Sequence, residues 1–100
     1  MFFITLFQKV KLNTKGLPDC GNIRTVGYVE TLEEAKKAVT ENWCDMQKGI
    51  YKFAVIEEIY PSIYPSVKQE LWFKWNRKER SFYPIEKPKC LSKFWTFALG

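Results

Sequence analysis

The residues best suited to bind a ligand lie in one stretch, LWFKWNRKERSFYP, at positions 71–84. This stretch contains five aromatic residues, and four of its five charged residues are Lys or Arg. Aromatic rings stack on nucleotide bases, and Lys and Arg side chains bind phosphate groups. The stretch therefore predicts a site for an anionic nucleotide or nucleic acid. The candidate ligand-binding residues are Trp72, Lys74, Arg77, Lys78, Arg80 and Tyr83.

The same stretch has the pattern of a β-hairpin with a tight turn at Arg77 and Lys78. A turn centred there places Trp72 opposite Tyr83, with Lys74 next along, on the face that points away from the core. Two interpretations of that face remain. The aromatic pair either stabilises the hairpin, by about 0.2–1 kcal/mol, or forms a stacking platform with cations beside it. The core face takes Leu71, Phe73, Trp75, Phe82 and Pro84.

Glu57 is a further candidate for ligand contact, through a carboxylate that accepts a hydrogen bond from a ligand amine. It follows Phe53 and Val55 on one face of the expected strand at 51–60, so an ideal strand points it inward. The alternative is a strand end, a bulge or a lysine partner. Glu58 belongs to the other face, so the two glutamates do not form an acid–base pair.

The composition disfavours catalysis and metal binding. The chain contains no histidine, which removes Ser-His-Asp and Cys-His pairings and the usual metal triads. Its cysteines, Cys20, Cys44 and Cys90, are widely spaced and form no CxxC motif, so we expect reduced thiols. We therefore predict that the protein is not an enzyme and has no catalytic residue, metal or cofactor. A small enzyme that uses a carboxylate such as Glu57 is the alternative.

The distribution of charge favours anionic partners. The formal net charge is +5, and positions 68–93 hold eight Lys or Arg against three Asp or Glu. Such a bias attracts anions over long range, although a solvated basic face would show the same composition.

The length and hydropathy predict a single cytoplasmic domain over residues 1–100. One hundred residues are enough for one core. No apolar run reaches the roughly 18 residues of a membrane span, so no membrane partner is expected. The N-terminal MFFITLF lacks a basic region before it and predicts a strand, not a signal peptide.

Hydrophobic periodicity predicts an α+β fold, with a mostly antiparallel sheet of about five strands, one long helix packed on a face and a short C-terminal helix. The first strand, FFITLFQKVKL at 2–12, is expected to be the longest. Gly27 predicts a bulge in the second strand or a close approach of another backbone segment. The remaining expected strands are 23–30, 51–60, 71–76 and 80–86.

The long helix is expected between Thr31 and Gly49. Thr31 and Glu34 match a capping box, which satisfies free amide groups at a helix start, and Gly49 is a typical helix stop. One apolar stripe at helical spacing predicts the buried face. Its residues are Leu32, Ala35, Val39, Trp43 and Met46.

The C-terminal segment predicts an interaction surface. Apolar residues at helical spacing after position 90 indicate a short helix that must dock on the sheet or on a partner. The alternative function is therefore a protein–protein interaction module or a small homo-oligomer such as a homodimer, whose C-terminal helix and hairpin contact a host protein or a second copy. The candidate interface residues are Phe94, Trp95, Phe97 and Leu99.

Three segments, RTVGYVETLEEAKKAVTEN, YKFAVIEEIY and LWFKWN, carry a resemblance that spans residues 24–85. Together they resemble uncharacterised small single-domain proteins of bacteria, phages and mobile elements. The shared pattern is a strand with Gly-Tyr, a capped helix, a central strand with Glu-Glu and a hairpin that contains Trp. The resemblance implies an accessory role in a phage or mobile element, such as inhibition of a host defence system by binding.

Overall fold

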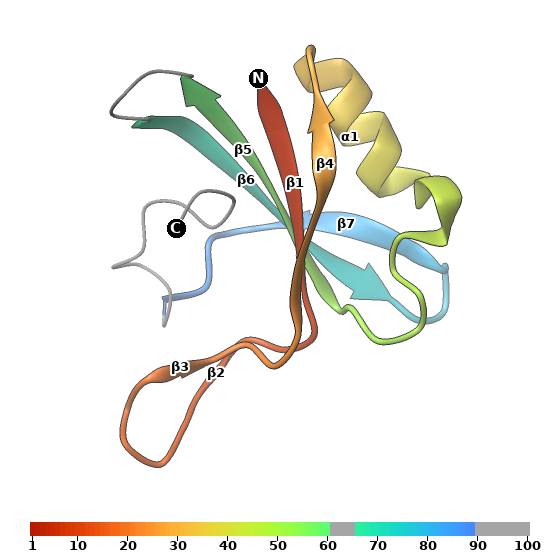
Figure 1. The fold of residues 1–100 in the computed structure, drawn as a ribbon. Coiled ribbons are helices and arrows are strands. Elements are labelled where there is room, and N and C mark those ends of the chain that lie inside the picture. The colour runs from red at the N-terminus through yellow and green to blue at the C-terminus, as the bar shows by residue number, and fades with distance from the viewer. Residues whose placement is uncertain (61–65, 90–100) are drawn as a thin grey trace.

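Alternating apolar residues build a five-stranded antiparallel sheet in the computed structural model, which describes residues 1–60 and 66–89 (Figure 1). The order of strands across the sheet is β4-β1-β5-β6-β7, and all neighbours are antiparallel. The predicted α+β class with a five-stranded sheet is confirmed. The strands are β1 (Phe2–Phe7), β4 (Ile23–Val29), β5 (Phe53–Tyr60), β6 (Ser66–Asn76) and β7 (Ser81–Ile85).

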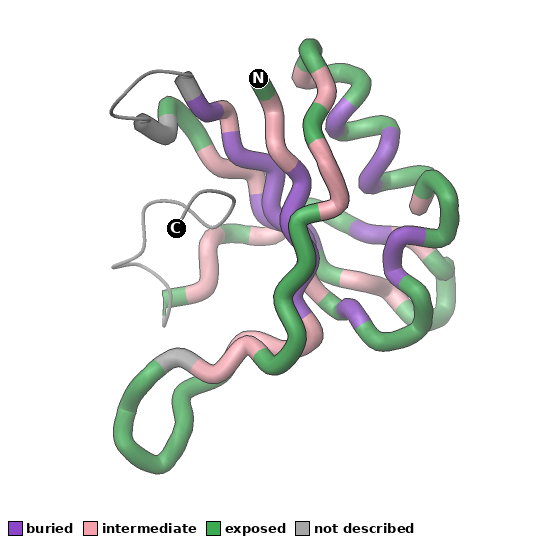
Figure 2. The backbone as a smooth tube through the Cα atoms, viewed as in Figure 1, coloured by how far each residue is buried: buried purple, intermediate pink, exposed green. Residues whose placement is uncertain are grey.

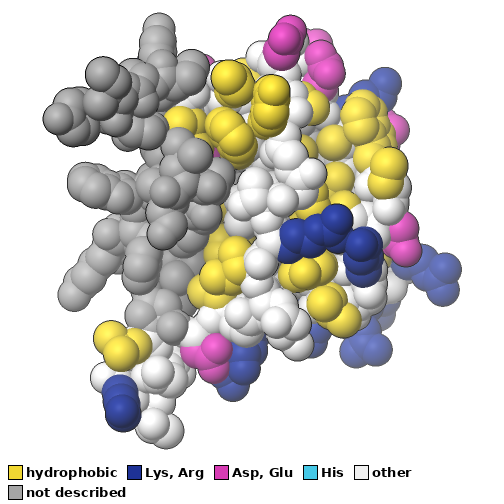
Figure 3. Space-filling model, in the orientation of Figure 1, with side chains coloured by type: hydrophobic (Ala, Val, Ile, Leu, Met, Phe, Trp, Pro, Cys, Tyr) yellow, Lys and Arg dark blue, Asp and Glu magenta, His cyan; other side chains and the backbone are white. Residues whose placement is uncertain are grey.

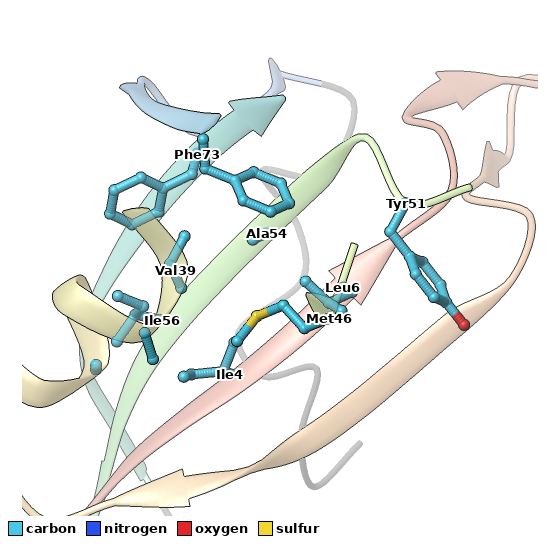
Figure 4. Packing of buried hydrophobic residues seen from close by; sticks show 11 residues of the cluster. Ile4, Leu6, Val39, Met46, Tyr51, Ala54, Ile56 and Phe73 are labelled. Atoms are coloured by element: carbon cyan, nitrogen blue, oxygen red, sulfur yellow. The ribbon is translucent and has the colours of Figure 1, made fainter. Parts of the chain in front are cut away.

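Helix α1 (Leu32–Thr40) packs on one face of the sheet (Figure 1). The main core lies between them, where Val39 of α1 meets Ile56 of β5 and Phe73 of β6 (Figure 4). Buried residues are concentrated in the middle of the central strands (Figure 2). The opposite face has a smaller cluster of its own, formed by Phe7, Val55 and Trp72. Both faces of the sheet are therefore covered at its centre.

The predicted start of the helix is confirmed. Thr31 has extended backbone angles, and its Oγ1 accepts a hydrogen bond from the backbone N–H of Glu34 (3.2 Å). The Thr31 hydroxyl also lies 3.2 Å from Oε1 of Glu34, to which it donates. One of the free amides at the helix start is thereby satisfied.

Replacing Thr31 with Ala is expected to lower the free energy of unfolding by about 1 kcal/mol, because the Glu34 amide loses its acceptor. Thr40→Ala is the matched control, since the Thr40 hydroxyl donates only within the same helix, to the carbonyls of Lys36 (2.8 Å) and Lys37 (3.5 Å). Such bonds add little to helix stability. Urea denaturation of the two variants measures the difference, and equal midpoints would contradict the role of the cap.

The predicted end of the helix is wrong. α1 ends at Thr40, and the chain continues through a 3-10 turn, η1 (Trp43–Asp45), to Gly49. Asn42, Cys44 and Asp45 have positive φ angles, between 49° and 55°, which an α-helix does not allow. Trp43 therefore leaves the apolar stripe and is 39% exposed. The buried residues of α1 are the predicted Ala35 and Val39 and, in addition, Ala38, whereas Leu32 is only partly buried.

The first strand is shorter than predicted. β1 ends at Phe7, and Lys11–Leu12 (β2) pairs instead with Pro18–Asp19 (β3) in a separate small hairpin (Figure 1). Among the strands of the described residues, the longest is β6, with 11 residues. An ion pair between Lys9 and Asp19 (3.1 Å) joins the base of the small hairpin. The Lys9 side chain, and then the N–H of Gly21, hold the pKa of the Asp19 carboxyl below its ordinary value.

The predicted bulge in β4 is confirmed. Ile4 of β1 pairs with Gly27, whereas the next residue, Thr5, pairs with Thr25, so Val26 is the extra residue. Gly27 has a φ angle of 147°, which glycine adopts more readily than other residues. The bulge twists this edge strand locally.

Part of the predicted structure lies outside the described residues. This holds for the loop at 61–65 and for the C-terminal helix with its interface residues Phe94, Trp95, Phe97 and Leu99. Within residues 1–60 and 66–89, no helix is long and apolar enough to cross a membrane. The same residues contain no group of three or more side chains that could hold a metal ion.

Candidate functional site at the hairpin end

The β6–β7 hairpin is present, but its predicted register is wrong by two residues. Trp72 pairs with Ile85, and Lys74 pairs with Tyr83. The turn contains four residues, 77–80, because the side chain of Asn76 accepts hydrogen bonds from the N–H groups of Lys78 (2.9 Å) and Glu79 (3.2 Å). A shift of two residues keeps every side chain on its predicted face but changes its neighbours.

Trp72 is buried, so the predicted stacking platform at this residue is wrong. Its side chain is 2% exposed, and its ring stacks on Phe7 of β1 with the centroids 5.4 Å apart. The indole N–H donates to Glu70 (3.2 Å), which also forms an ion pair with Lys87 (2.9 Å). Trp72 therefore belongs to the core of the face opposite α1.

Lys74 and Tyr83 are both exposed and lie directly opposite each other on this face. The Lys74 ammonium group lies 5.8 Å from the centre of the Phe53 ring. The structure thus retains one cation and one aromatic ring of the predicted outer face, at the end of the hairpin near the turn.

Glu57 is not brought together with these residues. Its side chain is fully buried, and its strand neighbours are Phe3 of β1 and Glu70 of β6. Lys74 of β6 pairs with Phe53, which lies four residues before Glu57 on β5. The buried carboxylate is not accessible from solvent, so the structure gives no support to the predicted contact of Glu57 with a ligand amine.

The turn presents Arg77, Lys78 and Arg80 to solvent. The ion pairs found among residues 1–60 and 66–89 join Lys9 to Asp19 and Lys87 to Glu70, and neither engages the turn. Dark blue side chains gather over this side of the molecule, where the turn and the loop after α1 lie (Figure 3). We call Lys74 and the turn residues Arg77, Lys78 and Arg80 the hairpin end.

A hollow of about 440 Å³ opens between the hairpin end and the loop that follows α1. Arg77 and Arg80 line one side of it, next to the half-buried indole of Trp75. Trp75 is held in place by an edge-to-face contact with Phe82, with the ring centroids 5.0 Å apart. The other side is formed by Asn42, Asp45, Gln47 and Gly49.

The loop side of the hollow is fixed by its own polar side chains. The side-chain oxygen of Asn42, Oδ1, accepts a hydrogen bond from the backbone N–H of Gln47 (3.0 Å), and the side-chain amide of Asn42 donates to the Asp45 carboxylate (3.1 Å). The Gln47 side chain accepts from the N–H of Gly49 (3.0 Å). Sequence reasoning missed these loop residues because their segment matches the pattern of a continuing helix. It missed Trp75 as a lining residue because alternation assigned this side chain to the core face.

Arg80 has a backbone conformation that favours glycine, with a φ angle of 53°. Arg80→Gly is expected to raise the free energy of unfolding by about 0.5–1 kcal/mol, because it relieves this strain. Arg77→Gly removes the same charge at a position without a positive φ angle, so it should not stabilise the protein. Thermal melts of both variants make the comparison. A lower melting temperature for Arg80→Gly would contradict the strain.

The part of the chain that the structure describes thus joins two arginines, an indole and a preformed polar loop around one open hollow. Such an arrangement can hold a phosphate between guanidinium groups while a flat ring contacts the indole edge or face. No protein-family model, curated protein or solved structure matches this chain. The functional interpretation therefore depends on the chemistry of the hollow and of the hairpin end.

Proposed function

We propose that the protein is a non-enzymatic binding protein that holds an anionic nucleotide or nucleic acid at the hairpin end. The observation that carries the proposal is the placement of Arg77 and Arg80 beside Trp75 in one hollow. Guanidinium groups bind phosphate oxygens through paired hydrogen bonds, and an indole offers a surface for a base. Both arginines are available, because no ion pair with a described residue engages them.

The size and shape of the hollow support a small ligand or a short stretch of single strand. Its volume of about 440 Å³ falls within the range of small-molecule sites, roughly 300–1,000 Å³. Lys74 and Tyr83 lie on the other face of the same hairpin, where they would contact a ligand that extends past the turn. Lys78 adds charge at the tip.

The electrostatic surroundings also favour an anion. The hairpin end with its turn and the loop at 41–52 before β5 carry six Lys or Arg against three carboxylates. These residues are Lys48, Lys52, Lys74, Arg77, Lys78 and Arg80 against Glu41, Asp45 and Glu79. A local excess of positive charge raises the rate at which anions associate.

We extend the proposal to a biological setting. A small cytoplasmic binding protein suits the accessory role in a phage or mobile element that the sequence resemblance implies, including inhibition of a host defence system. Binding alone would suffice for such a role, without catalysis.

The test is a titration of the full chain with a labelled single-stranded oligonucleotide, with ATP and with a cyclic nucleotide, at low and at moderate salt. We expect binding that weakens as salt rises, because phosphate contacts release counterions. Adenosine, which lacks phosphate, is the control and should bind far more weakly. Absence of binding to every phosphate-containing probe at low salt would refute the proposal.

A further inference from the structure

The outer edge of β4 has backbone groups that are available for strand pairing. The N–H of Gln8 donates to the carbonyl of Asn22 (3.0 Å), so Asn22 faces the sheet. Because backbone groups alternate in direction along a strand, Ile23 and Thr25 turn their N–H and C=O groups outward. No hydrogen bond from the described residues reaches the outer edge of β4.

The opposite edge of the sheet is closed to such pairing at one position. The N–H of Trp75 donates to Lys52 (2.8 Å), so Trp75 and Phe73 of β6 direct their backbone groups toward β5. Pro84, which pairs with Phe73, therefore has its nitrogen on the outer side of β7 and offers no donor there. β4 contains no proline and retains its outward donors.

A groove of about 430 Å³ lies beside β4, between this strand and the loop that follows α1. Val26, Trp43 and Met46 give it an apolar lining, and Arg24 and Lys48 add positive charge. Among the described residues, no Asp or Glu lines it. Yellow and dark blue side chains adjoin one another in this region of the surface (Figure 3). The groove thus combines an apolar lining with two cations.

We propose that the β4 edge and this groove bind an extended, acidic segment of another protein as an additional strand of the sheet. The backbone of the bound segment would pair with the outward N–H and C=O groups of Ile23 and Thr25. The side chain of the bound segment that lies opposite Arg24 would point toward the groove, where a carboxylate would contact Arg24 and Lys48. The intervening side chains would lie on the other face, beside Ile23 (53% exposed) and Tyr28 (60% exposed). The segment expected to fit therefore alternates acidic and apolar residues.

Charge favours a different protein over a second copy of this chain. If the β4 strands of two copies paired antiparallel, Arg24 and Lys48 of both copies would lie close to the new strand pair. Neither groove has a carboxylate among its described lining residues to balance these charges. Like charges placed opposite one another across strands are destabilising. An acidic segment supplies the missing complement.

The probe is a short capped peptide in which Glu and Val alternate, added to the full chain. We expect saturable binding and slower hydrogen exchange at the amides of Ile23 and Thr25, measured by NMR. The matching Lys/Val peptide should not bind, and a Glu/Val peptide N-methylated along one edge should bind only weakly. Arg24→Glu should weaken binding about tenfold, because a like-charge pair replaces an opposite-charge pair.

An Arg77→Ala/Arg80→Ala double variant separates this surface from the hairpin end, and it should bind the peptide as the natural chain does. Three results would overturn the proposal. The first is that the Glu/Val peptide does not bind, and the second is that it binds without slowing hydrogen exchange at the β4 amides. The third is that the chain sediments as a dimer without peptide and that its β4 amides are already protected from exchange. The last result would assign the edge to a second copy.

Discussion

Trp72→Ala is expected to lower the free energy of unfolding by about 3–5 kcal/mol, the range for removal of a buried aromatic side chain. Three stabilising features of the side chain disappear together. The ring is 2% exposed, it stacks on Phe7, and its N–H donates to the Glu70 carboxylate. The expected decrease is a large part of the stability of a domain of this size, so the variant should melt at a much lower temperature.

Two further variants make this result interpretable. Trp72→Phe keeps a ring against Phe7 but removes the indole N–H, so it should cost much less, about 1–2 kcal/mol. Tyr83→Ala removes an exposed ring from the neighbouring strand and should change stability least. Urea denaturation measures all three. If Trp72→Ala were as stable as Tyr83→Ala, Trp72 would not belong to the core.

The Arg77→Ala/Arg80→Ala double variant is expected to lower the affinity for a phosphate-containing ligand by roughly 10- to 100-fold, since hydrogen bonds to charged groups contribute about 1.5–3 kcal/mol. The fold should be unaffected, because both side chains are exposed. The dependence of affinity on salt should also become shallower, by roughly 0.7–0.9 in the log–log slope for each phosphate that the variant no longer neutralises.

Lys78→Ala is the matched control for this removal of charge. Lys78 lies in the same turn and is exposed, but it does not line the hollow. We expect a smaller decrease in affinity from Lys78→Ala, because this variant loses only long-range electrostatic attraction to the ligand. Arg77→Lys tests geometry, since an ammonium group keeps the charge but not the paired donors of a guanidinium. Equal decreases for Lys78→Ala and Arg77→Ala would show that the hollow is not the binding site.

The elements with a strong local signal could be predicted from the sequence. Thr31 and Glu34 identify the helix start because the capping contact involves residues only three apart. Gly27 identifies the bulge for a similar reason, since few other residues adopt its φ angle. Alternation also assigned the side chains of β6 and β7 to the correct faces, because it depends only on strand geometry.

The end of the helix and the hairpin register could not be predicted in this way. The segment from Asn42 to Gly49 keeps an apolar pattern at helical spacing, yet four of its non-glycine residues have positive φ angles. Those conformations are held by contacts such as the one from Gln47 N–H to the Asn42 side chain. The register of the hairpin likewise depended on Asn76, whose side chain accepts the N–H groups of Lys78 and Glu79.

The sequence by itself determined the α+β class, the helix start, the faces of the hairpin and the concentration of positive charge in its turn. Only the tertiary structure decided which candidates are available to a ligand. Periodicity cannot reveal that a face is covered by other parts of the chain, so it could not show that Trp72 and Glu57 are buried. Nor can it place Arg77 and Arg80 beside Asn42 and Gln47, because residues about thirty positions apart meet only when the sheet and the helix pack together.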